Sequence, residues 1–230
     1  MPTPSSNELK TIKVVFCSHD RVHAGWAYDM MHLVGSFISS GGMVPETQES
    51  FRLSLEWCMT SLLAEGRHKL AEVCKEKGAD KILWVDTDMR IPRQALQMLL
   101  RHREPIVGVN YVSRRPPFRF TAATKENEPL VTRPDSTGLV EVNHIGMGCL
   151  LTDISVFQGD GPHFTFDWER KEDNSWGQVG EDVFFCREAR SRGYKIYVDQ
   201  ELSAQVQHEG DFAFSPAEML PAGEYAVDAA

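Results

Sequence analysis

The sequence predicts an α/β fold: a single-domain, three-layer α/β/α sandwich whose central sheet is mostly parallel. Strand-like and helix-like segments alternate along the first half of the chain, which is the pattern of such sheets. A short apolar strand over 81–85 runs directly into two aspartates, and ligands of these sheets bind where strands end. The 230 residues are 42% hydrophobic, which is enough for one well-buried domain with little left for a second.

The elements of the first half follow from their hydrophobic periodicity. Residues 13–17 form a continuous apolar strand, and residues 22–39 carry apolar side chains at helical spacing until two glycines end the pattern. Residues 51–57 alternate strictly between apolar and polar side chains, as a half-buried strand does. The remaining expected elements are a helix over 65–77, the strand over 81–85, a helix over 92–102 that Pro92 opens, and a strand over 106–112.

The sequence predicts one domain over residues 12–215, between flexible tails at 1–11 and 216–230. The second half of this domain is less regular than the first, and a loop over 158–180 is rich in aromatic and polar residues. The other elements expected here are extended segments over 138–142, 147–151 and 203–207, a helix over 182–192 and a strand over 195–198.

Composition argues against several classes of protein. The net charge of −9 gives no general attraction to nucleic acid or to anionic lipid. The five cysteines are scattered without a Cys-x-x-Cys pair, which argues against a disulfide framework or a zinc cluster and suits a reducing compartment. No apolar stretch is long enough to span a bilayer, and the first residues lack the apolar region of a signal peptide. We therefore expect a cytoplasmic protein without a membrane span.

Two carboxylates stand at the end of the apolar strand over 81–85. Asp86 and Asp88 are two residues apart, so their side chains project to the same side of an extended chain. A hard divalent cation that carries phosphate groups needs converging oxygen ligands and open coordination positions. A solvated acidic turn is the alternative interpretation of the same two residues. Two features further along the chain favour the metal site.

Glu181 and Asp182 stand at the start of the helix expected over 182–192, and His208 follows the last extended segment. Acids in a first helical turn also complement the helix dipole, so this pair alone does not require a function. A neutral imidazole is a good ligand beside carboxylates for an ion such as Mn²⁺. No ligand role follows for the remaining histidines, which lack a mutual metal-binding spacing: His19, His23, His32, His68, His102, His144 and His163.

Taken in order, these motifs resemble the Rossmann-like glycosyltransferases of the A-type fold, and the chain is similar to glycosyltransferase family 2. The resemblance covers residues 13–210 and rests on the order and spacing of the motifs. Neither a Gly-x-Gly-x-x-Gly nor a P-loop pattern occurs, so the usual dinucleotide and ATP cradles are absent. The matching segments are 18–21, Arg67 within 64–69, 84–89, 138–148, Trp176 with 180–182, and His208.

The resemblance implies a role for each of these positions. Asp88 and His208 would hold a divalent metal, Mn²⁺ or Mg²⁺, and Asp86 would bind the ribose or share the metal. Asp182 would be the general base on the acceptor hydroxyl, and Glu181 would orient the acceptor or the sugar. The other implied contacts are to the nucleotide from Ser18, Asp20, Arg21 and Arg67, to the donor sugar from the backbone at Gly146 and Gly148, and to the acceptor side from Trp176, Trp168 and Phe166.

The implied activity is transfer of a sugar from a nucleoside-diphosphate sugar of the UDP or GDP type to an acceptor hydroxyl. A retaining enzyme would not need Asp182 as a base. One alternative is a nucleotidyltransferase that makes activated sugars, although the loop after the first strand lacks the expected Gly-rich phosphate-binding pattern. A second alternative is a sugar transferase that acts on a modified nucleic-acid base. The basic pair Arg114 and Arg115 permits this alternative, and the net charge of the chain disfavours it. A binding module without activity is a third, and it has no need of Asp182.

Overall fold

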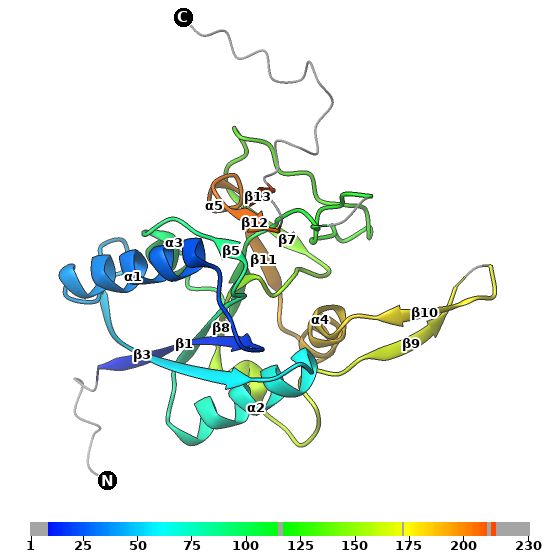
Figure 1. Ribbon diagram of the computed structural model, residues 1–230, viewed down its shortest axis with the longest axis horizontal. Coiled ribbons are helices and arrows are strands. Elements are labelled where there is room, and N and C mark those ends of the chain that lie inside the picture. Colours follow the sequence, from blue (N-terminus) through cyan, green and yellow to red (C-terminus); the bar gives the residue numbers. More distant parts are fainter. Residues whose placement is uncertain (1–8, 115–116, 172, 211–212, 215–230) are drawn as a thin grey trace, which may run out of the picture.

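A sheet of eight strands, in the order β2-β3-β1-β4-β8-β6-β11-β7, runs through the molecule (Figure 1). The computed structural model describes residues 9–114, 117–171, 173–210 and 213–214. The strands of the sheet are β1 (Lys10–Ser18), β2 (Met43–Val44), β3 (Glu49–Met59), β4 (Lys81–Val85), β6 (Ile106–Gly108), β7 (Leu139–Val142), β8 (Cys149–Asp153) and β11 (Ile196–Asp199).

The sheet is mixed, so the expectation of a mostly parallel sheet is wrong. Strand β1 runs parallel to β3 and β4, and β6 runs parallel to β11. Strand β8 lies between β4 and β6 and is antiparallel to both, while β7 is antiparallel to β11. Both β7 and β8 follow β6, and the described residues between β6 and β8 contain no helix. The alternation of strands and helices that predicts a parallel sheet therefore stops at β6.

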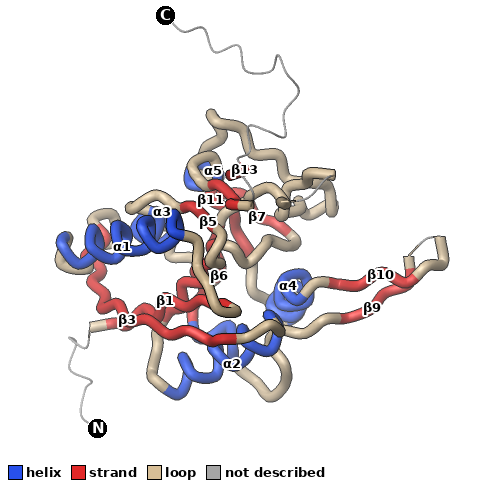
Figure 2. Tube along the Cα trace, viewed as in Figure 1, coloured by secondary structure: helices blue, strands red, loops and turns tan. Residues whose placement is uncertain are grey.

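Helices cover both faces of this sheet (Figures 1 and 2). Successive side chains of a strand point to opposite faces, so Val14 and Leu83 join one hydrophobic core while Val15 and Trp84 join the other. Burying one side chain of this kind contributes roughly 1.5–3 kcal/mol. The first core packs against α1 (Ala24–Ser39) and α3 (Ala95–Leu100), and the second against α2 (Leu63–Glu76), the 3-10 helix η1 (Ile154–Phe157) and α4 (Glu181–Ser191).

Two segments differ from the sequence-based expectation. The extended segment expected over 203–207 is wrong, because the chain first forms a short helix and resumes as a strand only at Gln207. The side chain of Asp199 accepts a hydrogen bond of 2.9 Å from the Leu202 N–H and so caps that helix. The aromatic loop expected over 158–180 contains an antiparallel hairpin. The elements are α5 (Gln200–Ser203), β9 (Asp167–Arg170) and β10 (Trp176–Val179).

A small sheet in the order β13-β12-β5 lies next to the end of β4. It brings the last described part of the chain back to the segment that follows Asp88, because β12 pairs antiparallel with β5. Its strands are β5 (Met89–Arg90), β12 (Gln207–Glu209) and β13 (Ala213–Phe214).

The ends of the domain differ in part from the expected boundaries. Strand β1 begins at Lys10, inside the tail expected over 1–11, and residues 1–8 of that tail lie outside the described residues. The tail expected over 216–230 also lies outside them. Among the described helices, none combines the length and the apolar character needed to cross a membrane.

Candidate active site

Backbone pairing places His208 beside Asp88. Strand β4 ends at Val85, and Asp86 and Asp88 follow it in a turn. In the small sheet His208 stands directly opposite Met89, the neighbour of Asp88. As a result, His208 Nε2 lies 3.5 Å from Asp88 Oδ2. The small sheet thus brings together two residues that are far apart in the sequence.

The His208 ring is held in one orientation. Its Nδ1 lies 2.8 Å from the carbonyl oxygen of Val112, which can only accept a hydrogen bond, so Nδ1 carries the proton. The ring also makes an edge contact with Tyr111, with 5.1 Å between centroids. Nε2 faces Asp88: with a proton it can donate to Oδ2, and without one it offers a lone pair to a metal. A ligating histidine commonly donates its other ring N–H to a backbone carbonyl in this way.

Asp88 has one partnered oxygen and one without a partner. Oδ2 lies 2.8 Å from the Arg114 guanidinium, and Oδ1 is buried with no hydrogen-bond partner among the described residues. Burial alone would raise the pKa of Asp88, but His208 and Arg114 outweigh it and hold the pKa below its usual range. A buried, unpartnered carboxylate oxygen is costly to leave unsatisfied. Asp88 and His208 therefore fit a divalent cation, for which this oxygen and Nε2 are suitable donors.

Arg67 forms hydrogen bonds to two of the predicted acids. Its side chain is buried, and its guanidinium donates to Asp86 Oδ1 at 2.6 Å and to Glu181 Oε1. The resemblance implied a nucleotide contact for Arg67, but both described bonds of its guanidinium go to protein carboxylates. Burial raises the pKa of Glu181, which the nearby Arg67 charge opposes. Arg67 thus fixes Asp86 and the start of α4 relative to one another.

A glycine explains why Arg67 can reach both acids. Gly66 packs so closely that an added Cβ would lie 2.4 Å from Thr60 Cγ2 and 2.9 Å from Cys17 Sγ. Only a residue without a side chain lets the first turn of α2 come this near to the end of β1. This close packing of α2 places Arg67 within hydrogen-bonding distance of Asp86.

Tyr111 occupies the space beside the two predicted donor-site glycines. An added Cβ at Gly146 would lie 2.5 Å from the Tyr111 hydroxyl, and one at Gly148 would lie 2.7 Å from Tyr111 Cζ. The Gly148 N–H donates to that hydroxyl at 3.0 Å. The structure thus gives both glycines an internal packing role, and approach of a donor sugar to their backbone stays a prediction. Sequence analysis missed Tyr111, although an aromatic side chain at the end of the strand expected over 106–112 was a usable signal.

Asp182 lies in the first turn of α4, directly after Glu181. Its side chain accepts a hydrogen bond of 2.7 Å from the Val183 N–H. Burial raises the pKa of Tyr111 well above its usual value, and the charges of Asp86 and Asp182 add to the effect. The Arg67 guanidinium bonds to Asp86 and to Glu181, the neighbour of Asp182, and this places the start of α4 near Asp86.

The loop after β1 runs beside the aspartates. The His23 N–H donates at 3.3 Å to the carbonyl of Thr87, the residue between Asp86 and Asp88. The Ser18 carbonyl accepts a 2.9 Å bond from Thr60, which anchors the start of the loop. The side chains of Asp20 and Arg21 are exposed and lie near each other, 3.6 Å apart. These two remain available to a ligand, and their nucleotide contacts stay predictions.

Trp176 lies away from the acids, on the hairpin. It is the first residue of β10, so the length of that strand separates it from Gly180, and the hairpin extends outward from α4 (Figure 1). Its ring is 59% exposed and is covered by the Arg170 guanidinium at 5.1 Å from the centroid. The side chains of Trp168 and Phe166 on the same hairpin are also exposed. The structure does not bring these aromatic residues to the edge of the sheet that holds Asp88.

A solved structure shares the fold of this chain. The crystal structure of A197 from STIV matches it with a TM-score of 0.58 at 17% identity, over 91% of each chain. At this identity the match concerns the fold alone. The structure of GalNAc-T7 with UDP, GalNAc and Mn²⁺ matches with a TM-score of 0.46 at 14% identity, over 85% of this chain and 43% of that one. No family model and no curated protein matches the chain.

Proposed function

We propose that this protein is a glycosyltransferase that moves a sugar from a nucleoside-diphosphate sugar to an acceptor hydroxyl. The observation that carries the proposal is the pairing of Asp88 with His208: Nε2 of His208 lies 3.5 Å from Oδ2 of Asp88, and the other oxygen of Asp88, Oδ1, is buried without a hydrogen-bond partner among the described residues. The fold supports the proposal, since these residues lie where β4 ends and ligands of α/β sheets bind at strand ends.

Asp88 and His208 would hold the divalent ion, Mn²⁺ or Mg²⁺. Bound there, such an ion stabilises the negative charge that develops on a departing diphosphate. Arg114 already contacts Asp88, and its side chain is 46% exposed, so it can turn from the carboxylate to a phosphate group. Asp86 is tied to Arg67 through one oxygen, which favours a ribose contact over a share in the metal site.

Asp182 would take the proton from the acceptor hydroxyl. The carboxylate of Glu181 is paired with Arg67, whereas the described contact of the Asp182 side chain is a hydrogen bond from a backbone N–H. Asp182 is therefore the carboxylate better placed to act as a base. General-base catalysis of this kind typically contributes ~10²–10⁴ in rate.

The experiment is a titration of UDP-sugars and GDP-sugars with and without Mn²⁺, followed by an assay for transfer. Asp88→Asn should lose cation-dependent binding and transfer together. Asp182→Asn should bind the donor as the wild-type protein does and lose transfer. Asp135→Asn removes an exposed carboxylate elsewhere and serves as the matched control. Full transfer by Asp182→Asn would overturn the base assignment, and cation-dependent binding by Asp88→Asn would overturn the metal site.

A further inference from the structure

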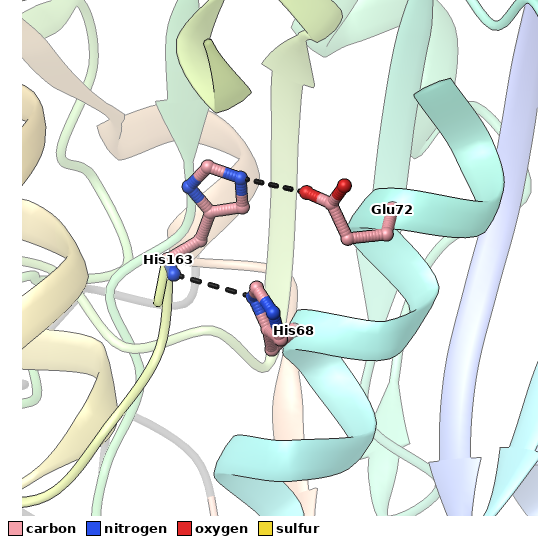
Figure 3. A group of neighbouring side chains, drawn as sticks. All are labelled: His68, Glu72 and His163. Carbon is pink, nitrogen blue, oxygen red and sulfur yellow. Dashed lines mark hydrogen bonds and ion pairs between the residues drawn. The ribbon is translucent and has the colours of Figure 1, made fainter. Parts of the chain in front are cut away.

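Three side chains with metal-ligand chemistry meet between α2 and the segment that follows η1. His68 and Glu72 lie one helical turn apart on α2, and His163 comes from the segment that follows η1 (Figure 3). One ligand atom from each residue lies within 4.8 Å of the other two. The three side chains point toward one another, although His68 and His163 are far apart in the sequence.

This cluster is already ordered without a ligand. His163 Nε2 lies 3.0 Å from Glu72 Oε1, and the His163 backbone N–H donates to His68 Nδ1 at 3.3 Å. The His163 side chain is only 5% exposed, and its ring packs edge-on against Phe157 with 5.3 Å between centroids. A helix turn and a buried ring therefore hold the donor atoms, and the rearrangement that a cation requires falls mainly on Lys75, which contacts Glu72.

The hydrogen bonds of the cluster show which nitrogen of His163 would bind the cation. His163 Nε2 faces Glu72, so Nε2 would be the donor to the metal. In the metal-bound form the proton of His163 would stand on Nδ1.

We propose that His68, Glu72 and His163 form a binding site for a divalent transition-metal cation, and that Zn²⁺ is the ion that fits it best. Two imidazoles and one carboxylate are a common zinc donor set, with a fourth, tetrahedral position for water. The hard cations Mg²⁺ and Ca²⁺ prefer sites built from oxygen ligands. This site is separate from Asp88 and His208 and does not rest on the proposed function.

The cation would clamp a glycine-rich segment to the helix that carries Arg67. Gly159 and Gly161 have positive φ angles of 99° and 143°, conformations that other residues rarely adopt. Together with His163 they line a cavity of about 150 Å³. Binding only to the folded chain raises the melting temperature by mass action.

Lys75 competes with the cation and provides a distinctive test. Its Nζ lies 3.0 and 3.2 Å from the two oxygens of Glu72, one of which also faces His163. A cation at the cluster must therefore displace or repel this ammonium group. Removing the charge should strengthen binding by about 5-fold, the size of a partly exposed ion pair. Most substitutions near a metal site do the reverse.

The experiment measures Zn²⁺ affinity by chelator competition in full-length Asp88→Ala protein. This substitution prevents Zn²⁺ bound at the other proposed site from contributing to the measured affinity. We expect one equivalent to bind. Glu72→Gln should lose more affinity than the ~10–100-fold that removal of a supporting contact causes. Glu76→Gln removes an exposed charge from the same helix and should bind as its parent does. Because Glu72 is partly exposed, the conservative change to Gln leaves the fold intact, which circular dichroism verifies.

Co²⁺ supplies an independent readout. A tetrahedral site of two histidines and a carboxylate should give visible absorption bands on addition of Co²⁺, and His68→Ala should abolish them. Lys75→Gln should raise the Zn²⁺ affinity, whereas Lys69→Gln, on the same helix, should change it less. The proposal is overturned if Asp88→Ala protein and its Glu72→Gln derivative bind Zn²⁺ equally. It is also overturned if neither protein binds Zn²⁺, in which case the cluster is a hydrogen-bonded packing contact.

Discussion

Asp86 and Asp88 stand two residues apart after the same strand, yet their surroundings differ. Asp86 is bonded to Arg67, which is also bonded to Glu181, so its charge is compensated inside the protein. Asp88 has one oxygen near Arg114 and His208 and a second, buried oxygen without a hydrogen-bond partner among the described residues. The difference indicates that one carboxylate of the motif holds the site together while the other is available to a ligand.

The largest expected effect is on stability and concerns Arg67, which pairs with Asp86 and Glu181. Arg67→Met leaves the carboxylates of Asp86 and Glu181 next to each other without their cation. Breaking a buried pair in this way typically costs about 3–5 kcal/mol, so the free energy of unfolding should fall by that amount in urea. Arg187→Met, which breaks an exposed pair with Glu169, is the control and should cost ~1 kcal/mol or less. Equal losses in the two variants would mean that the Arg67 pairs do not support the fold.

Substitution of Asp88 should lower the activity more than the stability. Asp88→Asn keeps the shape of the side chain and removes the charge that attracts a cation. We expect transfer to fall by ~10²–10³, the size of losing one electrostatic contact in a transition state. Urea unfolding should show a loss of about 1 kcal/mol, smaller than that of Arg67→Met, because the ion pair that is lost, with Arg114, is partly exposed. A stability loss as large as that of Arg67→Met would remove the distinction between the two aspartates.

A third acid, Asp199, extends the comparison to pH. Burial would raise its pKa, but hydrogen bonds from His102 and the Leu202 N–H, with the Arg101 charge, lower the pKa below its usual value. Because the folded pKa is the lower one, this stabilisation is complete above the unfolded value of about 3.9 and is lost as the pH falls through the folded pKa. Asp199→Asn should cost about 1.5–3 kcal/mol at neutral pH.

The Asp199→Asn substitution separates the contribution of the Asp199 charge to stability from the contribution of its helix cap. Asparagine still accepts the bond from Leu202, so only the charge of Asp199 is removed. The acid limb of a plot of unfolding free energy against pH should therefore become flatter in Asp199→Asn than in the wild-type protein. An unchanged acid limb would show that other carboxylates determine the stability at low pH.

The smallest effect is expected at Trp176, which the family resemblance placed at the acceptor side. The ring is exposed on the hairpin and contacts Arg170. A surface substitution of this kind usually stays within about 0.5 kcal/mol, so Trp176→Ala should change donor affinity by roughly 2-fold at most. A large change in donor affinity would mean that the hairpin folds over the site when the donor binds.

The sequence was sufficient where a motif needed only local geometry. The spacing of Asp86 and Asp88 and the apolar strand before them predicted their place at a sheet edge, because strand periodicity is a local property. The order of motifs also predicted that His208 belongs with Asp88. The pairing of His208 opposite Met89 provides the physical reason.

The sequence was insufficient where the outcome depended on partners from distant segments. Nothing near Arg67 indicates that it lies between Asp86 and Glu181, since the close approach depends on Gly66 and on the packing of α2. His68 and His163 showed no metal-binding spacing because the fold alone brings them together. The mixed sheet was missed because the alternation of strands and helices stops at β6, and β8, which follows it, pairs antiparallel with β4 and β6.

The most direct test of the account is calorimetric titration of UDP and GDP into Asp86→Asn and Asp88→Asn proteins, each with and without Mn²⁺. The account predicts that Asp88→Asn loses the Mn²⁺-dependent part of binding. It also predicts that Asp86→Asn keeps a Mn²⁺ dependence, with weaker binding and a less stable fold. The opposite pattern, a Mn²⁺ dependence that survives in Asp88→Asn and disappears in Asp86→Asn, would contradict it.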